Sequence, residues 1–114
     1  MIKNITKKTG LVTYYIYCIS NLSKATGLMF RKKLKGNGLI FVFKHEKITP
    51  LHMIFVFFPI DVVFLDKNKR VVEIKERFKP FSFYNPKNKA MFILELPVNV
   101  IKNSKTEIGD QLDF

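Results

Sequence analysis

A histidine and a carboxylate in apolar surroundings are the residues of this chain best suited to acid–base chemistry. His52 lies between Leu51 and Met53, and Asp61 is the one acid in its apolar run. An imidazole and a carboxylate can exchange protons with a substrate, so one hypothesis is a hydrolase or transferase that uses His52 and Asp61. The alternative is that His52 is a hydrogen-bonded residue of the core or its rim, which is the commoner role of a single histidine in a strand.

The chain has no spacing typical of a metal or nucleotide site. The other histidine is His45 and the single cysteine is Cys18, which leaves no zinc-binding pattern. Gly36 and Gly38 lack the Lys-Ser/Thr pair that a phosphate-binding loop requires. We therefore expect no metal and no cofactor. The favoured function is a small non-enzymatic binding or interaction domain, whose partner is an unidentified small ligand or protein.

Asp61 requires a partner if it is buried, because an isolated carboxylate in an apolar interior is very costly. Our hypothesis is that Arg31 forms a structural ion pair with Asp61 and attaches a short helix to the central strands. The alternative is that the same pair forms the floor of a ligand pocket.

A second candidate site is a loop that mixes aromatic rings with cations. Phe81, Phe83 and Tyr84 lie close in sequence to three lysines, which are Lys79, Lys87 and Lys89. Rings beside cations can stack bases or sugars, although a loop whose rings cover the sheet edge explains the pattern equally well. The sequence therefore predicts a possible ligand groove formed by His52, Arg31 and this loop.

Positive charge is concentrated in the first 45 residues. The chain has a net charge of +11, and this segment holds nine cations and no acid. Its densest part is a cluster that could bind anions, formed by Arg31, Lys32, Lys33 and Lys35. One alternative function is thus weak, sequence-independent binding of nucleic acid. Lysine outnumbers arginine 17 to 3, and arginine is the residue that reads phosphate and guanine bidentately, so a solvated lysine-rich face is the simpler explanation.

The length of 114 residues and the 47 % apolar content suit one domain with its own core. We expect a basic N-terminal arm over residues 1–10 and a single β-rich domain over residues 11–114. The lone cysteine cannot form an intrachain disulfide, which fits a reducing, cytoplasmic compartment.

Short segments rich in β-branched and aromatic residues predict a mainly β fold. We expect a small β-sandwich or barrel of about seven short strands with one or two short helices. The strands are expected at residues 11–19, 39–43, 50–58, 60–65, 71–76, 91–96 and 111–114, and the helices near residues 21–26 and 98–102. The run from residue 48 to 65 contains two prolines, a histidine and Asp61, so we read it as two buried strands and expect no membrane span.

Several motifs occur together in one order along the chain. The first is Gly27-Leu28-Met29-Phe30-Arg31, and the others are Met53 with Pro59-Ile60-Asp61-Val62, residues 64–66 and 70–72, Glu95-Leu96-Pro97 and Gly109-Asp110. Across about residues 11–114 the chain thereby resembles the small prokaryotic family known as domain of unknown function 192, or uncharacterised protein family 0127. The resemblance implies a mainly β, sandwich-like fold and leaves the biochemical role open.

The chain departs from the commoner pattern of that family at one place. Many members have Trp-Met-Lys-Asn-Thr where this sequence has His52-Met53-Ile54-Phe55-Val56. Any site built on the lysine and asparagine is thus absent, and this version of the motif looks like an archaeal branch of the family.

Overall fold

The centre of the fold is strand β6 (Ile60–Leu65), in which all six residues are buried. β-branched and aromatic side chains favour a strand, and a strand covered on both faces shows no apolar–polar alternation. The computed structural model describes residues 1–19 and 36–114. In it β6 pairs antiparallel with β7 (Val71–Phe78) on one side and β9 (Ala90–Pro97) on the other.

Five strands form the main sheet, in the order β3-β4-β9-β6-β7. The long strand β4 (Asn37–Lys47) pairs antiparallel with β9, whereas β3 (Tyr14–Cys18) adds to its other side in parallel. Two small sheets accompany the main one. The first contains β1 (Ile2–Asn4), β2 (Thr9–Val12) and β10 (Leu112–Asp113), and the second pairs β5 (Leu51–His52) with β8 (Phe83–Tyr84).

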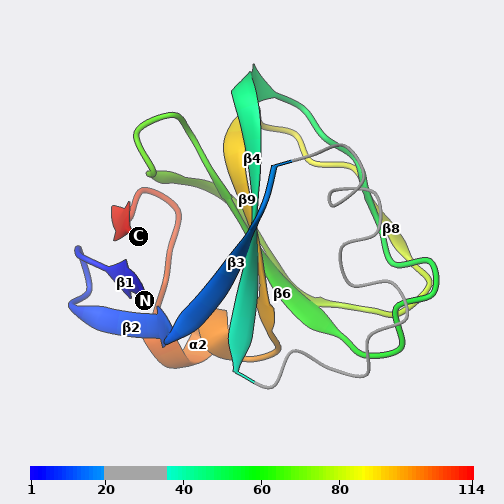
Figure 1. The fold of residues 1–114 in the computed structure, drawn as a ribbon, viewed down its shortest axis with the longest axis horizontal. Coiled ribbons are helices and arrows are strands. Elements are labelled where there is room, and N and C mark those ends of the chain that lie inside the picture. Colours follow the sequence, from blue (N-terminus) through cyan, green and yellow to red (C-terminus); the bar gives the residue numbers. More distant parts are fainter. Residues whose placement is uncertain (20–35) are drawn as a thin grey trace.

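Apolar residues pack on both faces of the main sheet. One cluster joins Val63 and Leu65 of β6 to residues of the three-stranded sheet and to Ile101 of helix α2 (Val100–Ser104). The other joins Val62 and Phe64 to the segment that carries β5 and β8. Figure 1 shows the same layers, with β1, β2 and α2 on one side of the central strands and β8 on the other. This arrangement confirms the mainly β fold class.

The first ten residues, expected as a basic arm, contain β1 and the start of β2. Ile2 and Asn4 are buried while Lys3 between them is exposed, which is the alternation of a half-covered strand. The amide nitrogen of Asn4 donates to the Thr106 hydroxyl at 3.1 Å and to the Asp110 carboxylate at 2.9 Å. Interleaved lysines conceal this short pattern in the sequence.

The prediction of a buried strand over residues 50–58 is wrong. Only Leu51–His52 forms a strand, and Phe55 and Phe57 are exposed. The segment turns instead, because Val56 donates its backbone N–H to the Met53 carbonyl and Phe55 takes a φ of 56°. A run of apolar residues does not distinguish a buried strand from an apolar turn. No helix among residues 1–19 and 36–114 is long and apolar enough to cross a membrane.

Candidate functional site

Asp61 is almost fully buried and is held by two backbone amides. One carboxylate oxygen accepts a hydrogen bond from Arg77 N at 3.1 Å, and the other accepts one from Ile101 N at 3.0 Å. The carboxylate therefore joins the end of β7 to the first turn of α2, which offers backbone N–H groups without intrahelical partners. The predicted partner Arg31 lies outside the described residues, so that ion pair stays a prediction.

Arg77 belongs to a bulge in β7. Ile60 pairs with Phe78 and Val62 with Lys75, so that two residues of β7, Glu76 and Arg77, stand opposite Asp61. Arg77 has a φ of 50°, in the left-handed region. The bulge turns its backbone N–H towards the Asp61 carboxylate and leaves its side chain at the surface.

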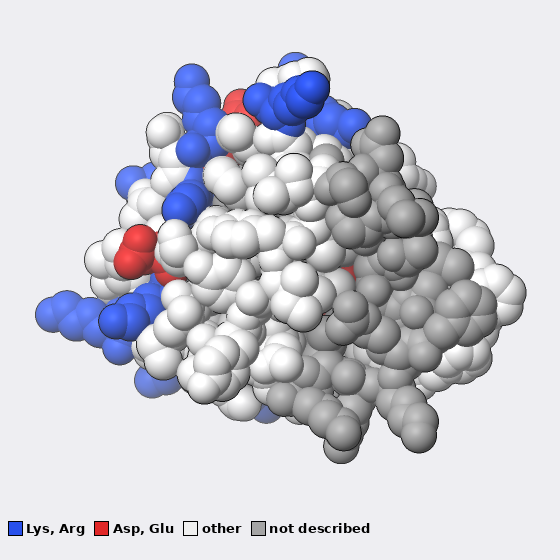
Figure 2. All heavy atoms as spheres, in the orientation of Figure 1, with Lys and Arg blue, Asp and Glu red and all other residues white. Residues whose placement is uncertain are grey.

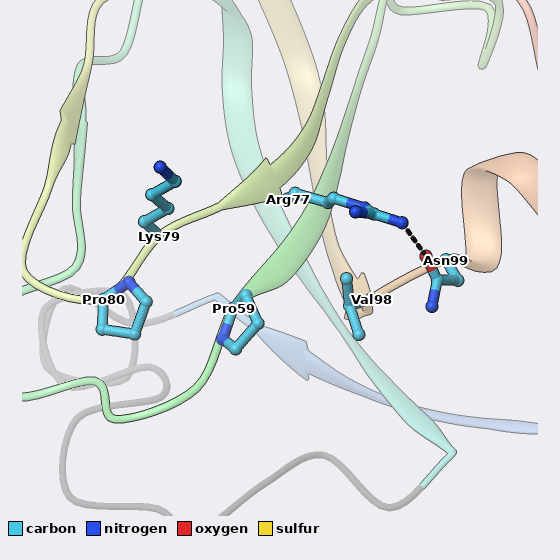
Figure 3. Close-up of a pocket in the computed structure, with 6 residues that line it drawn as sticks. All are labelled: Pro59, Arg77, Lys79, Pro80, Val98 and Asn99. Carbon is cyan, nitrogen blue, oxygen red and sulfur yellow. Dashed lines mark hydrogen bonds between the residues drawn. The ribbon is translucent and has the colours of Figure 1, made fainter.

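Asn99 immediately precedes α2 and is also left-handed, with a φ of 75°. The Arg77 guanidinium donates through Nη2 to Asn99 Oδ1 at 3.4 Å, and the two side chains point towards each other in Figure 3. Two residues with left-handed backbone thus meet where Asp61 binds Arg77 N and Ile101 N, the second of which lies two residues after Asn99. Such residues persist only when their surroundings hold them, and they concentrate at ligand sites.

A cleft of about 470 Å³ opens beside this pair. Its lining combines three apolar side chains with an amide and two cations, and the residues are Pro59, Val98, Pro80, Asn99, Arg77 and Lys79. Pro80 lies at one end of the cleft and Asn99 at the other (Figure 3). The volume falls within the ordinary range of small-ligand pockets, and an apolar lining with a few polar groups is typical of them.

A smaller, more polar hollow of about 190 Å³ shares Arg77 and Asn99 with the cleft. Its other lining residues are Asp61, Glu76 and Lys102. The two cations and two acids of this hollow balance in formal charge. The cleft of about 470 Å³, by contrast, has two cations and no acid in its lining.

The predicted aromatic groove is divided between two environments. His52 stands opposite Phe83 in the β5–β8 pair, and its Nδ1 accepts a hydrogen bond from Ile54 N at 3.3 Å. Phe83 is exposed, whereas the Phe81 ring contacts Phe57 instead. His52 and Phe83 therefore lie together, and Phe81 belongs to a separate group of rings.

Tyr84 packs against the core and is not part of a groove with His52. Its hydroxyl donates to the carboxylate of Glu73, and its ring packs against Phe64 and Phe78. Burial and the neighbouring Glu73 carboxylate raise the pKa of Tyr84 to about 12. Burial tends to raise the pKa of Glu73 as well, but hydrogen bonds from Tyr84, Asn88 and the Lys87 amide bring it below the ordinary value.

The two residues of the catalytic hypothesis, His52 and Asp61, bind different backbone amides. The Asp61 carboxylate binds the amides of Arg77 and Ile101, while the His52 ring binds that of Ile54. Within residues 1–19 and 36–114, no group of three His, Cys, Asp or Glu side chains could hold a metal ion.

The anion-binding cluster formed by Arg31, Lys32, Lys33 and Lys35 lies outside the described residues. Of the described cations in the first 45 residues, Lys7 is paired with Asp110 at 2.9 Å. Figure 2 shows lysines and arginines along the upper and left margins of one face, around a largely uncharged centre. Another hollow, of about 600 Å³, gathers three further lysines, and its lining residues are Lys44, Lys67, Lys89, His45, Glu46, Asn68 and Met91.

Sequence reasoning missed Arg77, Asn99 and Glu95. Arg77 reads as part of an ordinary exposed strand, and only the tolerance of asparagine for left-handed backbone hinted at Asn99. Glu95 carried the same signal as Asp61, since it stands between Leu94 and Leu96. In the structure it is buried opposite Val62, and burial raises its pKa to about 7.

The fold is a small β-domain, and the cleft beside its short helix α2 is large enough for a small ligand. The chain belongs to the family DUF192 (Uncharacterized ACR, COG1430), whose model matches residues 5–114. This confirms the resemblance seen in the sequence motifs. The family has no established function.

Relatives in the same family occur in archaea of the genera Thermococcus and Pyrococcus. A UPF0127 protein of Pyrococcus furiosus is 35 % identical over 97 % of this chain and 95 % of its own length. Another, from Thermococcus sibiricus, is 42 % identical over 77 % of this chain, but the match spans only 57 % of that relative. A solved structure of a protein of unknown function from Novosphingobium aromaticivorans superposes with a TM-score of 0.84 at 20 % identity, covering 99 % of this chain and 81 % of the other.

Proposed function

We propose that the chain is a non-enzymatic binding domain that holds an anionic group of its ligand in the cleft beside Arg77 and Asn99. One observation carries the proposal. Arg77 and Asn99 are both left-handed, their side chains are hydrogen-bonded, and the buried Asp61 carboxylate binds Arg77 N and also Ile101 N, two residues after Asn99. Backbone strain maintained at a surface cleft is best explained by a need to present these side chains to a ligand.

The cleft offers donors to an anion and an apolar floor to the rest of the ligand. Arg77 uses one N–H on Asn99 Oδ1, which leaves other guanidinium N–H groups and the Asn99 Nδ2 group as donors. Lys79 adds a second positive charge to the lining. Pro59, Pro80 and Val98 suit an apolar body. The ligand class is therefore a carboxylate, or a phosphate, attached to an apolar group.

Two features support binding over the alternative of catalysis by His52 and Asp61. The carboxylate of Asp61 accepts two backbone hydrogen bonds, one on each of its oxygens. The His52 ring accepts its hydrogen bond from the neighbouring Ile54 amide. Neither side chain orients the other, as a general base and its partner do.

Nuclear magnetic resonance titration of the full chain with 3-phenylpropionate and with inorganic phosphate tests the proposal. We expect shifts at the Arg77 and Asn99 amides with 3-phenylpropionate, and at least a tenfold weaker affinity in Arg77→Gln. Arg70→Gln is the matched control, because Arg70 donates to the Gly109 carbonyl and takes no part in the cleft. Shifts confined to other regions, or equal affinity in the two variants, contradict the proposal.

A second candidate function is sequence-independent binding of nucleic acid. It is favoured by the convergence of Lys44, Lys67 and Lys89 on one hollow, where the Glu46 carboxylate already accepts a hydrogen bond from the Lys67 amide at 2.9 Å. Binding of this kind must weaken steeply with salt. A fluorescent single-stranded RNA tests this function at 20 mM salt. The function is refuted if the RNA fails to bind, or if it binds equally well to a triple variant with Lys44→Gln, Lys67→Gln and Lys89→Gln.

The proposed location is the cytoplasm, for which the single cysteine is the supporting feature.

A further inference from the structure

Three phenylalanine rings form an exposed patch on chain segments that also line the cleft. Phe55, Phe57 and Phe81 are 44 %, 59 % and 51 % exposed. The centre of the Phe81 ring lies 6.2 Å from that of Phe55 and 5.4 Å from that of Phe57, and both contacts are edge-to-face. We call these three residues the aromatic patch. Its exposed area is roughly 300 Å², since each phenylalanine can bury about 200 Å².

The backbone holds these rings outward. Phe81 N donates to Met53 O and Met53 N donates to Ser82 O, both at 2.8 Å, so the two turns that carry the patch are joined. Met53 is 1 % exposed and anchors the joined turns to the core. Phe55 and Phe81 have φ values of 56° and 58°, which is strained backbone for bulky residues. The backbone that carries the patch is therefore held by hydrogen bonds and by the buried Met53.

The aromatic patch and the cleft share the same two chain segments. Pro59 follows Phe57 by two residues, and Pro80 directly precedes Phe81. Both prolines line the cleft, which continues from Pro80 to Asn99 (Figure 3). The segments that carry the aromatic patch therefore also supply the apolar end of the cleft, and cationic and amide donors complete its lining.

We propose that the aromatic patch and the cleft together bind a short, extended peptide segment of another protein, with a large apolar side chain on the patch and a carboxylate in the cleft. The proposal rests on the proposed function, because it places the anion at Arg77 and Asn99. The charge of the cleft selects the partner: Arg77 and Lys79 are present and no acid lines it, so the complementary segment is acidic.

Size and shape favour a peptide. A stable complex between folded domains buries about 800 Å² on each partner, more than the patch and cleft provide. A compact small molecule buries most of its own surface in its pocket, whereas the rings of the patch stand out from the surface. An extended segment advances about 3.3 Å per residue and can cover both parts with a few residues.

Selection of a random heptapeptide phage library on the full chain tests the inference. We expect enriched peptides to carry an aromatic or large aliphatic residue and an acid within a few positions of each other. Synthetic versions with a free and an amidated C-terminus then show whether a side-chain or a terminal carboxylate is bound. Affinities are measured by fluorescence anisotropy.

Three substitutions separate the patch from general surface effects. Phe57→Ser and Phe81→Asn should each weaken the selected peptide about tenfold, and asparagine is chosen because it tolerates the left-handed backbone of Phe81. Phe83→Ser is the matched control, because Phe83 is 69 % exposed and lies outside the aromatic patch. This control substitution should change the affinity for the peptide less than twofold. Thermal melting of every variant confirms that it is folded.

The results distinguish failure of the peptide inference from failure of the proposed function. Failure to enrich any peptide, or affinities unaffected by Phe57→Ser and Phe81→Asn, overturns the inference. In that case the proposed function still stands if 3-phenylpropionate binds in an Arg77-dependent way. Peptides that need Phe57 but bind Arg77→Gln with unchanged affinity refute the carboxylate contact and overturn the inference, and the titration with 3-phenylpropionate then decides the proposed function separately.

Discussion

The carboxylate of Asp61 accepts the backbone hydrogen bond of Arg77 at 3.1 Å, although the two residues are sixteen positions apart. The same carboxylate accepts the amide of Ile101 at 3.0 Å, forty positions away. One buried side chain therefore fixes the bulge in β7, the start of α2 and the wall of the cleft.

Asp61→Asn should destabilise the protein by about 2 to 4 kcal/mol. An asparagine offers one acceptor oxygen, so its NH₂ group would face one of the two amides and leave a buried donor without a partner. Urea denaturation measures the loss. Asp113→Asn changes an exposed acid of β10 and should stay within about 0.5 kcal/mol of the wild type, so similar losses in both variants contradict the role assigned to Asp61.

Glu95 should make stability fall as the pH rises from 4.5 to 7. Its folded pKa is about 7 and its ordinary value 4.5, so over this range the folded state binds the proton more tightly than the unfolded state. The stabilisation is complete below pH 4.5 and is lost as the pH passes 7. The difference amounts to about 3 kcal/mol.

Glu95→Gln removes this titration, and its free energy of unfolding should be nearly independent of pH in the range where the wild type changes. Denaturant unfolding at a series of pH values provides the measurement. Glu107→Gln serves as the control, because Glu107 is an exposed acid and its loss should leave the slope intact. An unchanged slope in Glu95→Gln shows that another group causes it.

Two substitutions of Asn99 distinguish the effect of its backbone conformation from the effect of its side chain on ligand binding. Asn99→Gly preserves the left-handed φ of 75° without strain, so stability should change by less than about 0.5 kcal/mol. Asn99→Ala should lose about 1 kcal/mol, because a Cβ disfavours this conformation. Both variants lack the amide and should bind 3-phenylpropionate equally poorly. Thermal melts and titrations measure the two effects, and full affinity in Asn99→Gly removes Asn99 from the site.

Tyr84→Phe should cost about 1 to 2 kcal/mol, since it removes the hydroxyl that donates to the buried Glu73 carboxylate. Lys87 N, Asn88 N and Asn88 Nδ2 still donate to Glu73, which limits the loss. Absorbance titration should show that the phenol with a pKa of about 12 disappears in this variant. Retention of that phenol assigns it to another tyrosine.

Local sequence was sufficient for the elements whose side chains follow a regular pattern. The strands expected at residues 60–65 and 71–76 occur as β6 and β7, joined by a short turn. The turn itself is stabilised locally, because Asp66 accepts the amides of Asn68 and Arg70. Residues 50–58 were misassigned because their apolar side chains divide between core and surface according to distant contacts, such as that between Met53 and Ser82.

The sequence by itself determined that Asp61 needs a partner, because a buried carboxylate without one is unstable wherever it lies. Only the tertiary structure decided that partners include the amides of Arg77 and Ile101. The physical reason is that any residue except proline can donate a backbone N–H, so side-chain identity carries no record of which amide will donate. The cleft has the same origin, since Pro59, Arg77 and Asn99 become neighbours only when β6, the β7 bulge and the start of α2 are joined.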